Sequence, residues 1–356
     1  MFANRIITTC IAIVATAATG VQSAEADPTQ TKQQETTTSS TSLKMDYTPK
    51  IHGVLRTRWE GEFGDEFTQR FQVRNARLSV EGKVLPTLGY YVRIDACDRG
   101  VMKILDAWAR WGFAGDWHVQ AGQFRVPFAT DCFRGPGAYY FANRSFLGKQ
   151  ILNMRAVGTQ LGYSCATLPL TVEAGVFNST SIGNHETWQR AMTYAAKASY
   201  RVRNITLSAS YISTEPDSVR INIVAGSITW QTGRWIVEGE YQNKHYERNR
   251  HKAVNAWNVF ASYAIPLNHP TFNQLSFQAR FDGMTDHSNG KRDDAKELVT
   301  NDPARRRITA GSTLAFINKP VKAAIRLNYE KYFYNAHTVI PAGCNDKVVA
   351  ELVVKF

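Results

Sequence analysis

The chain has 356 residues, of which 44% are hydrophobic, with a mean hydropathy of −0.32 and a formal net charge of +12. Beyond the N-terminus no segment offers the run of about 18 apolar residues that a transmembrane helix needs, which excludes a helical membrane protein. A soluble domain and a membrane-spanning β-barrel both remain compatible, because the alternation of a barrel strand halves its mean hydropathy.

Residues 1–24 are predicted to be a secretory signal peptide. Asn4-Arg5 supplies a short positive region, residues 6–18 are mostly apolar, and small residues follow near Ala24. An N-terminal helix of the mature fold is the alternative. Residues 25–47 are rich in Thr, Ser, Gln and Lys and nearly lack large apolar side chains. Such a composition cannot bury enough surface to order itself, so we expect a disordered periplasmic leader.

Residues 48–356 show the two-residue alternation of β-strands, and no convincing helical period interrupts it. In the first such segment Leu55 and Thr57 lie on one face, whereas Arg56 and Arg58 lie on the other. One apolar and one charged face suit a barrel with lipid outside and a wet lumen inside. The predicted strands, about sixteen in number, cover residues 50–59, 70–84, 88–97, 103–113, 116–125, 156–164, 170–178, 190–201, 204–213, 220–231, 234–244, 254–265, 273–284, 306–317, 320–333 and 346–356.

The second predicted strand changes phase near Asn75-Ala76. Phe71 and Val73 hold apolar positions before this point, and Leu78 holds one after it, but the spacing between them is odd. One extra residue in a strand is a β-bulge, which re-aims the side chains around it. We therefore expect a bulge here, with Arg77 pointing inward after it.

The connections between these strands alternate in length. Short ones such as 86–87, 115–116 and 203–204 alternate with longer ones, predicted over 60–69, 98–102, 126–155, 179–189, 214–219, 245–253, 285–305 and 334–345. Short turns on one rim and long loops on the other, with both termini on the periplasmic short-turn side, are typical of bacterial outer-membrane barrels. A soluble β-sandwich is the alternative, but its strands would mostly be shorter.

The last predicted strand alternates strictly and ends in an aromatic residue. Its apolar face holds every second residue from Val348 to Phe356, and its polar face holds Lys347, Glu351 and Lys355. Aromatic residues of barrel strands gather near the two membrane interfaces. This pattern favours a membrane barrel made of 48–356 over a soluble β-protein.

Four cysteines follow the predicted signal peptide, at positions 97, 132, 165 and 344. None of them has the spacing of a zinc site. Export permits disulfides, and Cys97 and Cys132 both fall on the extracellular side of the predicted layout. A bridge between these two and a set of unbridged thiols remain as alternatives.

The sequence lacks the motifs of common enzymes and cofactor sites. It contains no nucleotide-binding glycine loop, no closely spaced metal motif and no Gly-x-Ser-x-Gly elbow near its scattered histidines. We therefore predict no enzymatic activity and no cofactor. The isoelectric point of about 9.5 would suit nucleic acid, but export and a barrel exclude that partner. The expected partners are outer-membrane lipid, lipopolysaccharide and small inorganic anions.

Basic residues gather at the predicted inward positions and in the third long connection. Such side chains replace the hydration that an anion loses in a narrow pore, and arginine has donors matched to phosphate oxygens. The candidate anion-binding or pore-lining residues are Arg56, Arg58, Arg74, Arg77, Arg93, Arg110, Arg125, Arg134, Arg144, Lys149, Arg155, Arg280, Lys322 and Arg326. The alternative is that many of them pair with inward carboxylates such as Asp106. Arg305-Arg306-Arg307 and residues 248–252 are assigned to long loops, where they would meet lipopolysaccharide phosphates or solvent.

Several segments resemble the phosphate-selective porins of the O and P type. The most specific is Gly122-Gln123-Phe124-Arg125-Val126-Pro127-Phe128, which is similar to the GQF-(K/R)-x-PF segment at the start of that family's third loop. Weaker similarities lie at 75–82, at Asp106-Ala107-Trp108 and at Arg144-Ser145-Phe146. The resemblance is dense over residues 70–165. It implies a sixteen-stranded, homotrimeric porin for anions, whose third loop folds into the lumen and narrows it.

Two functions are consistent with these features. The first is a passive channel of the bacterial outer membrane that prefers phosphate or other small anions because arginine and lysine line its lumen. The second is an outer-membrane barrel that acts mainly as an adhesin or a binding protein through its extracellular loops. Conductance separates them, since an adhesin predicts a sealed lumen.

Overall fold

The structure is a computed structural model that describes residues 46–98, 101–148, 154–165, 167–180, 182–184, 186–336 and 338–356. The predicted signal peptide and residues 25–45 of the predicted leader lie outside the described residues. Within these ranges no helix is both long and apolar enough to cross a membrane.

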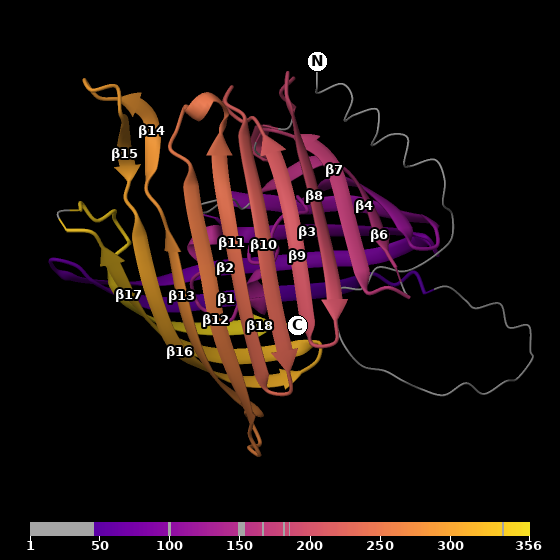
Figure 1. Cartoon of the computed structure of the whole chain (residues 1–356). Helices are drawn as coiled ribbons and strands as arrows, with labels where there is room; N and C mark the ends of the chain where they lie inside the picture. Colours follow the sequence, from indigo (N-terminus) through magenta and orange to yellow (C-terminus); the bar gives the residue numbers. More distant parts are fainter. Residues whose placement is uncertain are drawn as a thin grey trace, which may run out of the picture.

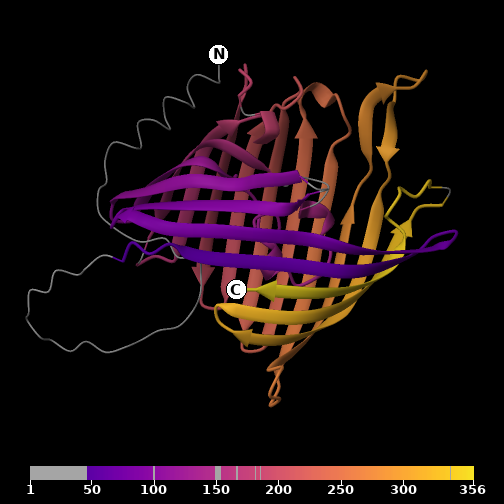
Figure 2. The same cartoon turned by 180° about the vertical axis from the view of Figure 1, so that it is seen from behind.

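Sixteen antiparallel strands of the described chain close into a barrel, in which each strand pairs with its neighbours in sequence and β1 pairs with β18 (Figures 1 and 2). The barrel strands are β1 (Lys50–Phe63), β2 (Phe67–Leu85), β3 (Leu88–Asp98), β4 (Val101–Ala114), β5 (Trp117–Arg125), β6 (Arg155–Ser164), β7 (Leu170–Asn178), β8 (Met192–Val202), β9 (Ile205–Thr214), β10 (Ile221–Thr232), β11 (Trp235–Tyr246), β12 (Val254–Pro266), β13 (Gln274–Met284), β16 (Arg305–Asn318), β17 (Val321–Tyr334) and β18 (Asp346–Lys355). Single turns of 3₁₀ helix are η2 (Pro136–Ala138), η4 (Ile182–Asn184) and η5 (Glu247–Asn249).

The barrel wall carries polar side chains inside and apolar side chains outside. Arg56, Arg326 and Glu351 face inward and are at most 2% exposed, whereas Leu327 and Leu352 face outward and are 52% and 45% exposed. Because side chains alternate between the two faces of a strand, this inverted pattern requires an apolar medium around the barrel. The predicted fold class, an all-β transmembrane barrel of sixteen strands, is confirmed.

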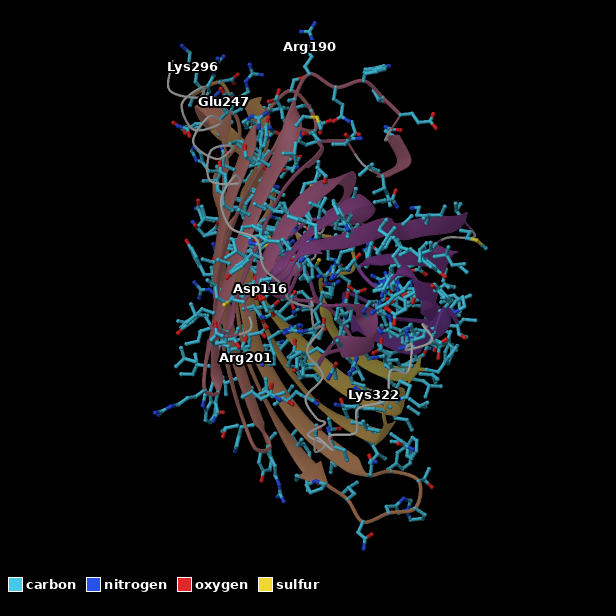
Figure 3. All side chains as sticks on the ribbon, turned by 90° about the vertical axis from the view of Figure 1, so that its right-hand side faces the viewer. Asp116, Arg190, Arg201, Glu247, Lys296 and Lys322 are labelled. Carbon is cyan, nitrogen blue, oxygen red and sulfur yellow. The ribbon has the colours of Figure 1, made fainter. Side chains whose placement is uncertain are left out.

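The two rims of the barrel differ in the length of their connections. In Figure 3, Arg190, Glu247 and Lys296, which belong to long connections, lie at one end of the molecule. Arg201 and Lys322, which lie beside short turns, are found toward the other end. The long rim is therefore extracellular in an outer-membrane barrel, and the short rim is periplasmic.

Two connections predicted to be long, 60–69 and 98–102, are short. β1 and β2 stay paired as far as Phe63 and Phe67, and β3 and β4 extend to Asp98 and Val101. Backbone pairing continues here beyond the apolar band, into polar residues that an alternation pattern does not mark as strand. Strands β1 to β4 are consequently longer at this rim than the sequence predicted.

The connection predicted over 285–305 holds a hairpin that the sequence did not indicate. Its strands are β14 (His287–Arg292) and β15 (Leu298–Asp302), which form a separate two-stranded sheet. In Figure 1 this hairpin stands above the rim between β13 and β16. A polar hairpin of this kind lacks the apolar alternation by which strands are predicted.

The predicted β-bulge in β2 is present, one residue earlier than expected. Arg56 pairs with Asn75 and Thr57 pairs with Val73, so that Arg74 has no partner in the β1–β2 ladder. Arg77 then lies inside the barrel, as predicted, and pairs with Asp95.

The four cysteines of the described chain form no disulfide. Cys97 donates a hydrogen bond from its Sγ to the carbonyl of Val73, whereas Cys132 is buried within the 126–148 segment. Of the two alternatives, unbridged thiols are therefore confirmed, and the bridge between Cys97 and Cys132 is absent.

An apolar cluster joins the 126–148 segment to the inner wall of the barrel. Phe128, Phe146 and Leu147 of the segment belong to one buried cluster with inward residues of β7, β9 and β10, among them Phe177 and Ile212. These inward positions are apolar on otherwise polar faces because the segment covers them. The cluster fixes the segment against the barrel wall, and the most specific motif of the sequence, residues 122–128, leads into that segment.

Candidate functional site

The strand that leads into the segment between β5 and β6 contains a backbone position that requires glycine. Gly122 has a φ of +128°, and a Cβ at this position would lie 2.3 Å from the carbonyl oxygen of Ala107. The next residue, Gln123, donates its amide to the carbonyls of Ile104 and Leu105, at 2.6 and 3.1 Å. Those carbonyls lie where the β3–β4 register shifts. The Gly-Gln pair therefore shapes the end of β5, from which residues 126–148 depart.

Arginines of the barrel wall bind the backbone of this segment. Four of them, from four different strands, each donate a hydrogen bond to a different backbone carbonyl. The pairs are Arg56 with Ala142 at 2.6 Å, Arg280 with Asn143 at 2.9 Å, Arg307 with Arg144 at 2.7 Å, and Arg326 with Tyr139 at 2.7 Å. We call these four residues the wall arginines. They hold residues 139–144 across the inner faces of β1, β13, β16 and β17.

Acidic and amide side chains of the wall accept hydrogen bonds from the backbone N–H groups of the same segment. The Glu240 carboxylate accepts from Thr130 and Asp131, at 3.2 and 2.7 Å. On the other side of the segment, the Asp282 carboxylate accepts from Phe146 at 3.0 Å. The backbone is thus bound through both its donors and its acceptors, as a buried irregular segment must be.

Two arginines of the site donate to the segment from within it. Arg125 donates to the carbonyls of Cys132 and Arg134, both at 2.9 Å, and Arg144 donates to those of Asp131 and Cys132, at 2.8 and 3.0 Å. A carbonyl satisfies a guanidinium N–H but does not cancel its charge. Neither Arg125 nor Arg144 forms an ion pair with a described residue.

The Asp131 carboxylate lies at the centre of the segment and is almost fully buried. Burial alone would raise the pKa of Asp131, but the charges of Arg134 and Arg144 and a hydrogen bond from Ser145 outweigh it and lower that pKa. Asp131 consequently stays ionised and keeps the two arginines in place.

Most of the predicted site residues form ion pairs. The pairs are Arg56 and Arg326 with Glu351, Arg58 with Glu60, Arg77 with Asp95, Arg93 and Arg155 with Asp106, Arg134 with Glu238, and Arg280 with Asp282. These arginines therefore follow the alternative given above, in which inward arginines pair with inward carboxylates.

The remaining predicted site residues have other surroundings. Arg110 donates two hydrogen bonds to Gln120, at 2.6 and 2.8 Å, and stacks on Trp108. Arg74 is exposed at the bulge, and Lys322 lies near the short-turn rim. Lys149 lies outside the described residues.

The assignment of Arg305-Arg306-Arg307 to a long loop is wrong, because all three residues belong to β16. Arg305 and Arg307 are buried in β16, and Arg307 pairs with Asp282 at 2.7 Å and with Glu330 at 3.0 Å. Extending the alternation of β16 backwards would have found them, because Arg305 and Arg307 share a face with Thr309. Only Arg306 points outward, and it is exposed.

The five consecutive strands β2 to β6 carry an excess of positive charge. They contain nine arginines and lysines but only four acids. Each of these strands supplies at least one candidate arginine, and the set is Arg74, Arg77, Arg93, Arg110, Arg125 and Arg155. Arg125 lies within electrostatic range of both Arg155 and Arg144. Like charges repel at such range. This side of the barrel therefore carries a net positive charge, although Arg70, Arg77, Arg93 and Arg155 each pair with an acid.

Two small cavities lie against the segment, and the one beside Arg125 and Phe128 has a volume of about 10 Å³. The cavity between the segment and β12–β13, lined by Arg134, Tyr140, Phe260 and Arg280, has a volume of about 10 Å³. That is about the space of one water molecule. No group of three or more His, Cys, Asp or Glu side chains suited to a metal ion occurs among the described residues.

Known structures share this fold at low sequence identity. An anion-selective porin from Comamonas acidovorans is 11% identical, with a TM-score of 0.60 over 87% of this chain and 99% of that chain. OmpT of Vibrio cholerae, in a trimer form, is 12% identical, with a TM-score of 0.57 over 87% and 98%. OprB of Pseudomonas putida is 10% identical, with a TM-score of 0.60 over 86% and 93%. At such identities the likeness concerns the fold.

The sequence family is given by the first half of the chain. No curated protein matches the chain. Residues 57–232, from β1 to the end of β10, match the family described as phosphate-selective porin O and P. The resemblance predicted from the sequence is thus confirmed. The family match and the barrel fold identify the chain as a bacterial outer-membrane porin, of which residues 57–232 match the phosphate-selective porin O and P family.

Proposed function

We propose that this porin is a passive channel that prefers small inorganic anions, phosphate among them. The observation that carries the proposal is the net positive charge of β2 to β6, which includes Arg125, together with the nearby Arg144. A porin conducts ions of the sign opposite to the charge of its narrowest part. Forked arginine donors also match the oxygens of phosphate. The proposal involves no catalytic step and no cofactor.

We propose further that residues 126–148 cross the lumen and set its narrowest part. The hydrogen bonds of the wall arginines and of Glu240 and Asp282 support this, because they reach the segment from strands on several sides of the barrel. We place the ion path on the β2–β6 side because these strands carry the excess of positive charge. Anions would then pass between Arg144 and the arginines of that wall.

Weak and repeated binding suits conduction better than a single tight pocket. Arginines on five neighbouring strands provide repeated contacts. Asp95 and Asp106, which pair with Arg77, Arg93 and Arg155, moderate the attraction so that an anion can leave. We also propose that a signal peptide at 1–24 directs export, and that the outer wall meets lipid and lipopolysaccharide.

The test is the reversal potential of single channels in a planar bilayer with a KCl gradient. We expect the potential to have the sign of chloride permeation, and added phosphate to reduce the chloride current by competing for the same arginines. A cation-directed potential would contradict the charge argument. Absence of any conductance would favour the alternative function, a barrel that binds partners through its extracellular loops.

A further inference from the structure

The extracellular hairpin β14–β15 is joined to the neighbouring 247–253 loop by an aromatic contact. The Tyr246 hydroxyl lies 2.6 Å from Nε2 of His287. The rings of His251 and His287 are stacked, with an interplanar angle of 2° and centroids 5.8 Å apart, and the Tyr246 ring lies 4.6 Å from that of His251. We call Tyr246, His251 and His287 the aromatic contact. Two of its three members are histidines.

Polar bonds at the same place fix the geometry of the aromatic contact. His251 Nδ1 lies 3.2 Å from the carbonyl of Ser288, and since a carbonyl only accepts, this nitrogen carries the proton. The backbone N–H of Lys252 donates to Ser288 Oγ at 2.9 Å. Gly290 lies directly against the His251 ring, where a Cβ would come within 2.9 Å. The hairpin is therefore held against the loop on one small surface.

The charged groups around the aromatic contact are mostly positive on the barrel side. Lys244 of β11 lies over the Tyr246 ring at 5.2 Å, and Lys252 of the loop pairs with Asp286 at 2.8 Å. Asp302 of β15 pairs with Arg305 of β16. Both acids near the histidines are thus engaged by other bases, and neither is free to balance a new positive charge on the imidazoles.

We propose that the aromatic contact is a pH-sensitive attachment, which holds the β14–β15 hairpin to the rim at neutral pH and releases it in acid. When both imidazoles are neutral, the rings stack and Tyr246 donates to His287. When they are protonated, two like charges face each other at stacking distance with Lys244 beside them. Stacked cations repel, and partial burial strengthens that repulsion.

The direction of the pH dependence follows from the surroundings of His287. Burial, and then the charges of Lys244 and His251, lower the pKa of His287. The imidazole binds its proton more weakly in the attached hairpin than in a released one. The attachment is therefore fully stable above the ordinary histidine range, near about pH 6.5, and loses stability as the pH falls through and below it.

Hydrogen–deuterium exchange of the intact porin tests this proposal. The amides of 287–302 should exchange about tenfold faster at pH 5 than at pH 7.5, after correction for the intrinsic rate, if one imidazole proton controls the attachment. His287→Gln keeps a partner for Tyr246 without a titratable group and should remove most of this difference. His251→Gln removes the second charge and serves if the first variant does not fold.

His269→Gln is the matched control, because His269 lies in the 267–273 turn on the other rim, where it stacks on Phe272. This variant should keep the pH dependence of the wild type. Equal exchange at both pH values in the wild type, or an unchanged pH dependence in both His251→Gln and His287→Gln, would overturn the proposal. Neither result would bear on anion preference.

Discussion

Arginine serves two different purposes inside this barrel, and the partners of each guanidinium distinguish them. The wall arginines donate to backbone carbonyls of the 126–148 segment and also lie within ion-pair distance of buried carboxylates, so their charge is balanced. Arg125 and Arg144 donate to carbonyls alone. In the proposed channel the second kind supplies charge to a permeant anion, although the Asp131 carboxylate near Arg144 offsets part of that charge. The sequence presents both kinds of arginine alike.

Removing one of these two charges should weaken the anion preference of the channel. For Arg144→Ala we expect the chloride-to-potassium permeability ratio to fall by about fivefold, since a charge near the ion path contributes about 1 kcal/mol in a wet pore. Arg125→Ala should act in the same direction. Reversal potentials in a salt gradient measure the ratio.

The control for this pair of variants is Arg144→Lys, which keeps the charge and loses the forked geometry. It should retain most of the chloride preference and lose part of any competition by phosphate. If selectivity is unchanged in both alanine variants, the positive segment is not what selects the ion.

At the scale of residues, alternation predicted correctly that Arg56, Arg77 and Arg326 lie inside the barrel. It could not predict their partners. Arg326 meets the carbonyl of Tyr139, a residue 187 positions away in the sequence, and a backbone carbonyl has no sequence signature. Whether an inward arginine is structural or available to ions is decided by such distant contacts.

At the scale of elements, the GQF-R-x-PF segment has a purpose that its sequence alone does not reveal. Gly122 allows two strands to approach closely, and Gln123 donates to the carbonyls of Ile104 and Leu105, where the β3–β4 register shifts. The motif thus ends β5 at the point where residues 126–148 turn away from the wall.

Gly122→Ala should destabilise the barrel, because alanine strains a φ of +128° and its Cβ would meet the carbonyl of Ala107. We expect a loss of about 1–3 kcal/mol, measured as a lower midpoint of urea unfolding in detergent. Gly226→Ala in β10 is the matched control, since a Cβ there meets nothing within 4 Å. Equal midpoints for the two variants would refute the role assigned to Gly122.

Strand positions were largely predictable, because period-two alternation is strong wherever one face meets lipid. The ends of the strands were less predictable. β1 and β2 continue past the apolar band as a paired ribbon, and β14–β15 is mostly polar with only Leu298 and Val299 apolar. Neither therefore carries the alternation that marks a strand. The aromatic contact could not be predicted either, because His251 and His287 are 36 positions apart in the sequence and no local pattern connects them.

At the scale of the whole molecule, we expect a homotrimer in the membrane. The support is the family resemblance and the trimer form of OmpT, a structurally similar outer membrane protein of Vibrio cholerae. Native mass spectrometry in a mild detergent should give three times the mass of the mature chain, whose precursor is 40.0 kDa. A single-chain mass, under conditions that preserve the trimer of a related porin, would contradict this expectation.

The closure of the barrel has a consequence for the order of its assembly. β1 and β18 pair through ten residue positions, and Arg56 bonds to Glu351 across 295 positions of sequence. Contacts so distant along the chain form late. Until they form, the growing sheet has two unsatisfied edges, each able to pair with a foreign strand. A nascent chain of this protein must therefore be shielded in the periplasm for as long as its two outermost strands remain apart.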